Sequence, residues 1–213
     1  RETLSANLTG LAGRTLNALV INNEALGSLD FTGLGAGELL TNTSGAFLFT
    51  LTGGADDTEY GTVLSGFDAG IAVGGAEYIF HVVNPSAAAT TPRLVVTVVS
   101  PLTTAADITK SGRGTLILNG TNIAGGDANT TTLNEGVLEI SGLANIGGAS
   151  GGLVFAGGTL RLGSGFSDDL SLRDISFLTG GGTIDTNGTD LIMTASLGSG
   201  VGGFTKVGDG NLI

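Results

Sequence analysis

Few residues of this chain have the types and spacings that catalysis needs. Residues 148–152, GASGG, match the G-x-S-x-G pattern in which a serine, here Ser150, is the nucleophile of a hydrolase. That site also needs a strand before the serine, a helix after it, and a histidine and an acid alongside. The one histidine, His81, lies in the apolar run YIFHVV, where we expect an ordinary strand residue. The sequence therefore does not favour a serine hydrolase, and we expect no catalytic residue.

Acidic residues form a second candidate group, because polysaccharide-cleaving enzymes use paired carboxylates. The acidic groups here are neighbours within polar loops, where adjacent side chains diverge, and the chain has no tryptophan for sugar stacking. We therefore expect these acids to form turns and to maintain solubility rather than to catalyse. The groups are Asp56, Asp57 and Glu59; Asp168 and Asp169; and Glu135 with Glu139.

The sequence predicts no cofactor and no metal site. GGADD at 53–57 and VGDGN at 207–211 resemble the Gly-Asp turns of calcium-binding repeats, but neither repeats in tandem, so calcium is only a minor alternative. Gly198, Gly200 and Gly203 spell G-x-G-x-x-G without the βαβ unit that a dinucleotide site needs. The absence of cysteine removes disulfides and thiolate metal sites.

The net charge of the chain excludes some classes of binding partner. The net charge is −11, and the eight basic residues are scattered along the sequence, so we expect no basic patch. A chain of this kind is repelled by phosphate backbones and anionic membrane surfaces. We therefore expect no nucleic-acid partner. We also expect no membrane insertion, since the most apolar windows are interrupted by proline or serine.

The elements that must position these residues are short strands. Apolar residues alternate with polar ones over runs bounded by Gly, Asn, Asp and Ser, which is typical of half-buried strands that end in turns. Glycine and asparagine at almost every strand end, together with 5% aromatic residues, favour a thin stacked core with tight corners. The inward residues predicted from parity are Leu116, Leu118, Leu133, Leu138, Ile140, Leu153, Phe155, Leu160, Leu162, Ile184 and Leu191.

One phrase occurs twice, as ITKSGRGTLIL at 108–118 and as FTKVGDGNLI at 204–213, and each copy holds one of the two lysines. The separation of 96 residues predicts about four turns of a solenoid. Equivalent positions then stack, with Gly112, Gly114, Gly208 and Gly210 as corner glycines of positive φ. Lys110 and Lys206 have inward parity. We expect each amine to curl out at its corner, as a solvated lysine, or to bond turn carbonyls, rather than to have a functional role.

The order of these blocks resembles the autotransporter-associated β-strand repeat, also called the passenger-associated transport repeat. TKSGRGTLILNGTN, NTTTLNEGVLEISG, GGLVFAGGTLRLGSG and GGGTIDTNGTDLIM follow one another as the T-K-x-G-x-G-x-L-x-L, T-T-x-N-x-G-x-L and G-G-x-L blocks of that family do. The resemblance covers about residues 102–213. It implies an all-β, right-handed parallel β-helix (β-solenoid) located extracellularly or on the bacterial outer surface, and it implies no chemistry.

The resemblance also sets the expected organisation. Residues 1–101 form a divergent solenoid half with a proline-containing loop excursion near 85–101, and residues 102–213 form regular repeats continuous with it. The irregular segment from Asp56 to Pro92 is the better place for a specific binding surface.

The expected function is a non-enzymatic structural protein, a stalk, fibre or adhesin segment. The alternative is a β-helical polysaccharide-binding or polysaccharide-degrading module. Expected partners are further repeats or other copies through open solenoid ends, which would build filaments, and host or cell-surface glycans or proteins. We expect the regular half to be truncated at Ile213, since the second phrase breaks off there.

Overall fold

The chain forms three parallel β-sheets and almost no helix. The structure is a computed structural model that describes residues 2–4, 8–9, 13–24, 27–35, 37–55, 58–84 and 93–213. Asp56, Asp57, Pro85 and Pro92, which figured in the sequence predictions, lie outside these residues. No helix in the described ranges is long and apolar enough to cross a membrane.

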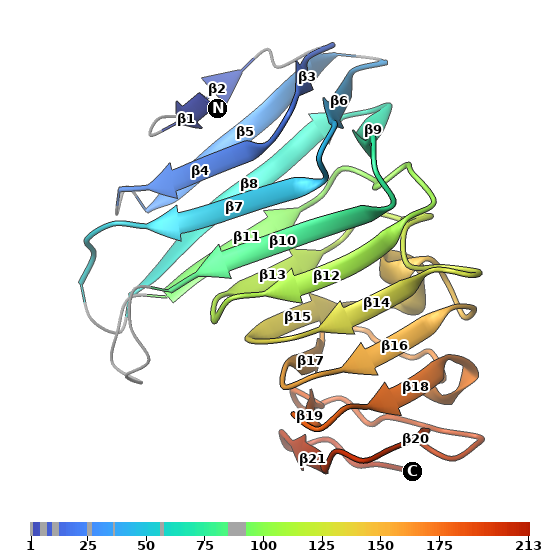
Figure 1. Cartoon of the computed structure of the whole chain (residues 1–213). Helices are drawn as coiled ribbons and strands as arrows, with labels where there is room; N and C mark the ends of the chain where they lie inside the picture. The colour runs from blue at the N-terminus through green and yellow to red at the C-terminus, as the bar shows by residue number, and fades with distance from the viewer. Residues whose placement is uncertain are drawn as a thin grey trace.

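The first sheet runs the length of the molecule, and each of its strands pairs in parallel with the strand of the next turn (Figure 1). In spatial order it contains β1 (Glu2–Leu4), β4 (Leu19–Asn23), β7 (Ala46–Leu51), β10 (Glu77–Val83), β12 (Asp107–Ser111), β14 (Thr130–Leu133), β16 (Gly152–Phe155), β18 (Asp174–Phe177) and β20 (Ser199–Gly200).

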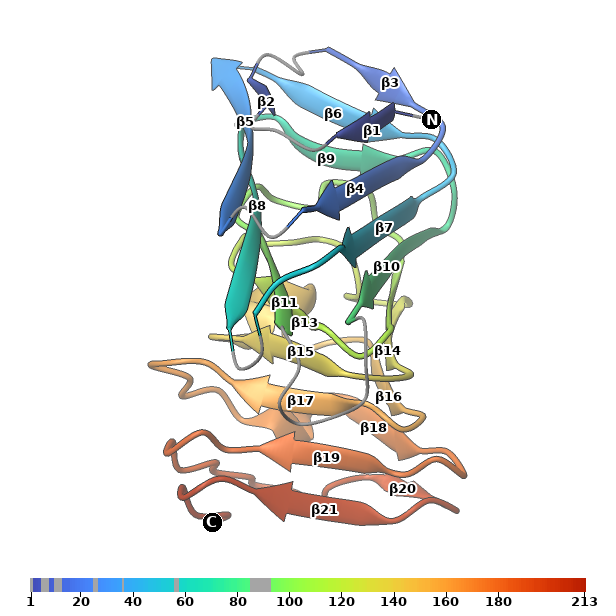
Figure 2. The same ribbon diagram turned by 90° about the vertical axis from the view of Figure 1, so that its left-hand side faces the viewer.

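The second sheet is parallel too and alternates with the first along the chain. It contains β2 (Leu8–Thr9), β5 (Ser28–Gly35), β8 (Glu59–Phe67), β11 (Arg93–Val98), β13 (Thr115–Leu118), β15 (Val137–Ile140), β17 (Thr159–Leu162), β19 (Gly182–Asp185) and β21 (Phe204–Val207). Figure 2 shows the strands of both sheets stacked from β1 to β21, which lie at opposite ends.

The third side is a sheet only in the N-terminal half, where β3 (Thr15–Leu16), β6 (Leu39–Asn42) and β9 (Gly70–Val73) pair. Further on, this side consists of turns, the short 3₁₀ helices η1 (Leu143–Ile146) and η2 (Leu170–Leu172), and single bridges such as that between Leu191 and Leu212. An all-β chain whose long parallel sheets follow one another in this order is consistent with a β-solenoid.

The turns shorten along the chain. One inward position of the first sheet is occupied successively by Leu19, Phe47, Phe80, Lys110, Leu133, Phe155 and Phe177. The first three intervals are 28, 33 and 30 residues, and the last three are 23, 22 and 22 residues. Apart from the earlier interval from Glu2 to Leu19, which is 17 residues, the turns are therefore broad before Lys110 and narrow after it.

The core between the sheets is the one that strand parity predicts. All eleven residues predicted to point inward, from Leu116 to Leu191, are at most 1% exposed. Aromatic rings stack between turns, as with Phe47 and Phe80, whose ring centroids are 4.9 Å apart. Alternating burial along each short strand, such as in β13, β15 and β17, follows from the two-residue period of a strand.

Two sequence predictions about position are wrong. The first copy of the repeated phrase begins on β12 in the first sheet, whereas the second begins on β21 in the second sheet. The copies do not stack, because 96 residues exceed four of these turns by one further strand. The segment expected to be irregular, 56–92, contains the regular strands β8, β9 and β10.

The corner glycines are confirmed in part. Gly112 and Gly208 have φ of 71° and 78°, in the left-handed region that favours glycine. Gly114 and Gly210 do not have positive φ, and the prediction is wrong there. They are required for space instead, since a Cβ on Gly114 would lie 2.4 Å from Val82 Cγ1.

Candidate functional site

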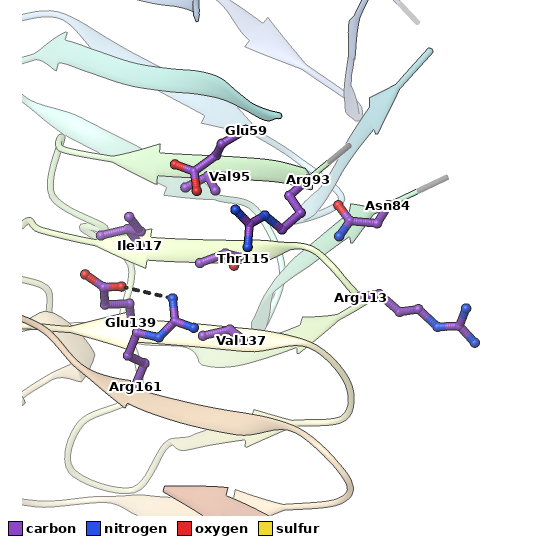
Figure 3. A pocket seen from close by; sticks show the side chains of 10 residues that line it. All are labelled: Glu59, Asn84, Arg93, Val95, Arg113, Thr115, Ile117, Val137, Glu139 and Arg161. Carbon is purple, nitrogen blue, oxygen red and sulfur yellow. Dashed lines mark ion pairs between the residues drawn. The ribbon is translucent and has the colours of Figure 1, made fainter. Parts of the chain in front are cut away.

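A hollow of about 260 Å³ lies on the outer face of the second sheet. It extends over five neighbouring strands, from Glu59 on β8 to Arg161 on β17 (Figure 3). Because strands lie about 4.8 Å apart, the hollow is about 19 Å long in the stacking direction. We call it the sheet-two groove.

Register explains why this surface is hollow. The outward residues Val95, Thr115 and Val137 lie in one column and form the floor. Two residues further along the strands, Ile117, Glu139 and Arg161 form one wall. Two residues before the floor lie Arg93, which begins β11, and Arg113, which immediately precedes Gly114 and β13. A floor of short β-branched side chains between longer charged ones produces a groove.

One wall carries a ladder of alternating charge. Arg161 Nη1 lies 3.7 Å from a carboxylate oxygen of Glu139, and Arg161 Nε donates a hydrogen bond to Asp185 at 3.0 Å. These residues occupy one register position on β15, β17 and β19. The two acids are therefore held on either side of one guanidinium, which satisfies their charge instead of placing them across a substrate bond.

The other wall differs in its pairing. Arg113 forms an ion pair with Glu135 at 2.9 Å, and its side chain points away from the groove in Figure 3. Arg93 points toward Thr115 on the floor. Within the described ranges, neither Arg93 nor its cross-strand neighbour Glu59 has an ion pair or a side-chain hydrogen bond. As far as the described residues go, the groove thus offers one guanidinium and one carboxylate without an ion-pair partner.

The basic residues are not as scattered as the sequence implies. Arg93, Arg113 and Arg161 are far apart in the chain, yet all three line the sheet-two groove. Parallel stacking brings these residues together, but Glu59 and Glu139 line the same groove, and Arg113 and Arg161 have acidic partners, so among the described residues they do not form a basic patch. A second hollow around the corner, about 230 Å³, shares Arg113 and Asn84 and adds His81 and Glu135.

Lys110 is fully buried beneath the corner at residues 112–114, between β12 and β13. Its Nζ donates to the carbonyl oxygens of Ser111, Gly112 and Glu135, at 2.8, 2.5 and 3.1 Å. Burial lowers the pKa of Lys110 to about 7, opposed by the nearby charge of Glu135. Bonding to turn carbonyls is confirmed, and a solvated lysine is wrong here. Lys206 is half-buried and repeats one of these contacts, donating to Gly208 O at 2.7 Å.

Ser150 and His81 are not brought together. The Ser150 hydroxyl donates to Asp127 Oδ1 and accepts from the Asp127 backbone N–H. The exposed His81 ring has Nδ1 2.8 Å from Ser111 Oγ. In the part of the chain that the structure describes, no carboxylate bonds the other nitrogen of that ring. These contacts do not assemble a nucleophile, a base and an orienting acid.

Asp168 and Asp169 support turns, as the sequence predicts. Asp168 accepts a hydrogen bond from the Leu143 backbone N–H at 2.6 Å, which joins two successive turns. Asp169 caps η2 by accepting from Ser171 N–H at 2.9 Å. Hydrogen bonds from Ser171 and then Thr194 lower the pKa of Asp169 to about 2, so this carboxylate stays ionised. Both side chains therefore stabilise turns through hydrogen bonds to the backbone.

The candidate metal, dinucleotide and acidic sites do not have the neighbouring residues or elements that such sites need among the residues that the structure describes. Among the residues described, no three His, Asp or Glu side chains gather as a metal site. Gly198 and Gly200 lie at the short strand β20, and Gly203 is followed by β21 rather than by a helix. Glu59 and Glu139 both line the sheet-two groove, whereas Glu135 lies on the neighbouring hollow.

Sequence reasoning missed Asp185 and Arg173 as organising residues. Asp185 could have been found, because VLEI, TLRL and TIDT carry Glu139, Arg161 and Asp185 at the third position of successive blocks. Arg173 gives no such pattern. It is 4% exposed, and its guanidinium donates to the carbonyls of Gly125, Ile146, Gly148 and Gly152 at 2.6–2.9 Å.

Comparison with known proteins gives one relative. The chain is similar to the adhesin BmaC autotransporter of Brucella suis biovar 1 (strain 1330), with 39% identity over 115 residues. The similar region is 49% of this chain and 3% of that protein, so the chain matches a small part of its relative. No protein-family model and no solved structure matches the chain. The similarity supports a relation to autotransporter proteins.

Proposed function

We propose that this chain is a non-enzymatic segment of a bacterial autotransporter adhesin, displayed extracellularly or on the outer cell surface. The observation that carries the proposal is the 39% identity to the adhesin BmaC autotransporter. The uninterrupted parallel stacking of the first two sheets supports it, because such stacking builds an extended scaffold from successive turns. The role of the segment is to span length and present its outer faces as part of a stalk or fibre.

The proposed architecture is a closed, right-handed coil of the autotransporter-associated repeat type. Strands that return in parallel to the same sheet need a crossover, and such crossovers are right-handed in nearly all proteins. The ordered blocks between residues 102 and 213 support the repeat assignment. Repeats of this type serve structure, which agrees with the use of Ser150, Asp168 and Asp169 in turns.

The proposed partners at the solenoid ends are further repeats or other copies of the chain. The last turn exposes the apolar side chains of Val201, Phe204, Val207, Leu212 and Ile213. Parallel strands at such an end also present unpaired backbone groups to the next turn. End-to-end addition of turns would extend the scaffold into a longer fibre.

Surface display tests this function directly. Residues 1–213 are placed between a secretion signal and an outer-membrane autotransporter anchor, and intact cells are labelled with antibody and treated with protease. We expect surface labelling and a protease-resistant fragment. Leu138→Pro is the matched control, because proline in the central β15 removes a sheet hydrogen bond. Its product should be labelled but readily digested.

Three results would contradict the proposal. The first is a wild-type chain that folds but stays inside the cell envelope. The second is a wild-type chain digested as fast as Leu138→Pro. The third is hydrolysis of an ester, a peptide or an acidic glycan that disappears in Ser150→Ala, His81→Ala or Asp168→Asn/Asp169→Asn, since that would show an enzyme.

A further inference from the structure

We propose that the sheet-two groove binds a linear glycan that carries carboxylate groups, such as a chain of uronic acids. The inference rests on the proposed surface location, where such glycans are encountered, and it adds a ligand class to it. The groove lies across five strands and is about 19 Å long, so it suits a chain that runs along the stacking direction rather than a compact small molecule.

The groove has a guanidinium available for an anionic group. Arg93 is exposed, points toward the floor at Thr115, and has no ion-pair partner in the ranges the structure describes. Arg161 lies at the opposite wall, where Asp185 and Glu139 hold its guanidinium in place. A guanidinium presents two parallel N–H groups that match a carboxylate. In Arg93 neither group is bonded to any residue that the structure describes.

Hydroxyl groups of the glycan have partners as well. Glu59 and Glu139 line the groove and are hydrogen-bond acceptors, while Thr115 has a hydroxyl on the floor. Asn84 lies at the rim, where its Oδ1 accepts a hydrogen bond from Leu94 N–H and its amide N–H₂ donates to none of the residues that the structure describes. Acceptors and donors that alternate around a half-apolar floor suit a ligand rich in hydroxyls more than a purely apolar one.

An extended peptide fits this face less well. Peptides that bind sheets usually add a strand to a free edge through main-chain hydrogen bonds. The sheet-two groove lies on the face of β11, β13 and β15, whose backbones are already paired on both sides. The net charge of −11 disfavours a polyanion as densely charged as a nucleic acid, in which the charges lie closer together than one per sugar ring. The geometry therefore points to a glycan with separated carboxylates.

Calorimetric titration of purified residues 1–213 with tetragalacturonate tests the site. We expect saturable binding that weakens as salt is added, and much weaker binding of the fully methyl-esterified tetramer, which has the same ring framework without charge. Arg93→Gln should weaken binding at least about tenfold, because it removes a charge-assisted bidentate contact. Arg93→Lys should lie between Arg93→Gln and wild type.

Arg14→Gln is the matched control, since Arg14 is an exposed arginine that does not line the groove. It should bind as wild type does, and the Arg93 variants should melt at the wild-type temperature. Equal binding of the methyl ester, an Arg93→Gln variant that binds normally, or tetraglutamate that competes equally would overturn the inference. So would the absence of saturable binding at millimolar tetragalacturonate.

The inference and the proposed function fail separately. A chain that reaches the cell surface but binds no tetragalacturonate contradicts only the glycan site. A chain that binds tetragalacturonate through Arg93 but is never exported contradicts only the surface role.

Discussion

Lys110 has the most constrained side chain of the corner between the first two sheets. Its ammonium has three N–H groups and three carbonyl acceptors, two from its own turn and one, Glu135 O, from the next. The acceptors favour the charged form, whereas burial in the column between Phe80 and Leu133 opposes it and lowers the pKa to about 7. Lys110 therefore joins two turns, and the free-energy cost of burying its ammonium group depends on pH.

This cost gives a prediction for stability. Below about pH 7 the amine is protonated in both folded and unfolded chains. Between about 7 and the ordinary lysine value of 10.5, the unfolded chain binds more protons, so the free energy of unfolding rises with pH. Lys110→Met removes this dependence and leaves three carbonyls without their donor. We expect it to destabilise the fold by about 2–4 kcal/mol near neutral pH.

Urea unfolding of wild type and Lys110→Met at several pH values on both sides of 7 measures this. The difference in stability between the two proteins should widen as pH rises above 7. Lys206→Met is the control, because Lys206 is only half-buried and has a single carbonyl contact. A difference that stays constant with pH would show that Lys110 keeps its ordinary pKa.

Glycine 114 gives a second prediction at the residue scale. Its φ is not positive, but an added Cβ would lie 2.4 Å from Val82 Cγ1 and 2.9 Å from Leu94 O. Gly114→Ala should therefore destabilise the fold by about 1–3 kcal/mol through overpacking. Gly75→Ala has no atom within 4 Å of its Cβ and should change stability little. Equal thermal melting of the two variants would contradict the close approach at Gly114.

Sequence predicts part of what these residues do. The inward parity of Lys110 follows from counting along the strand, and so does the bonding of its amine to turn carbonyls, since a buried amine needs acceptors. The identity of the third acceptor could not be predicted, because Glu135 O comes from the following turn. The space needed at Gly114 likewise depends on Val82, one turn earlier in the stack.

At the scale of elements, Arg173 joins the ends of three successive turns. Arg173 itself immediately precedes β18. One of its four carbonyl acceptors, Gly125, lies before β14, and the other three, Ile146, Gly148 and Gly152, lie before β16 or at its first residue. Burial lowers its pKa to about 10, which leaves the guanidinium charged at neutral pH. Strands β14, β16 and β18 are therefore fixed in register at one corner by a single side chain.

Arg173→Met should destabilise the fold by about 3–5 kcal/mol, because several buried carbonyls lose a charged donor. Hydrogen exchange should rise first in the turns around Gly125 and 146–152. Arg113→Met is the matched control, as the Arg113–Glu135 pair is about half exposed and contributes at most about 1 kcal/mol. Uniform exchange in Arg173→Met, without a local increase in these turns, would contradict the proposal that Arg173 fixes the register of β14, β16 and β18.

The strands themselves were predictable, whereas the groove was not. Alternating hydrophobicity identifies the inward residues because a strand with one buried face has a period of two. The sheet-two groove depends on which outward residues stack, and that requires the length of each turn. In the second sheet, residues paired between successive turns are 20 to 34 positions apart, so Arg93, Arg113 and Arg161 could not be aligned from the sequence alone.

At the scale of the whole molecule, the last turn exposes Leu212 and Ile213 at 40% and 64%. We expect purified residues 1–213 to self-associate as concentration rises, since apolar side chains at a solenoid end favour stacking of another turn. Leu212→Lys with Ile213→Lys should keep the chain monomeric by placing like charges at this end. Light scattering measures the change.

Ile123→Lys with Leu172→Lys is the control, because these side chains are exposed to a similar degree but lie on the lateral third side. This pair should self-associate as wild type does. A wild-type chain that stays monomeric over a wide concentration range would contradict the open-end prediction, and equal loss of association in both double variants would place the contact elsewhere.

The shortening of the turns has a mechanical consequence. Hydrogen bonds between turns lie along the stacking direction. A force applied between the two ends of the molecule therefore acts on the hydrogen bonds of every pair of successive turns in series. In the broad half three sheets share that load, through β3, β6 and β9 as well as the two long sheets. In the narrow half the third side has mostly turns and single bridges, and two sheets of short strands bear nearly all of it. Under tension we therefore expect the narrow half to unwind before the broad half, which contains β8, β10 and β11.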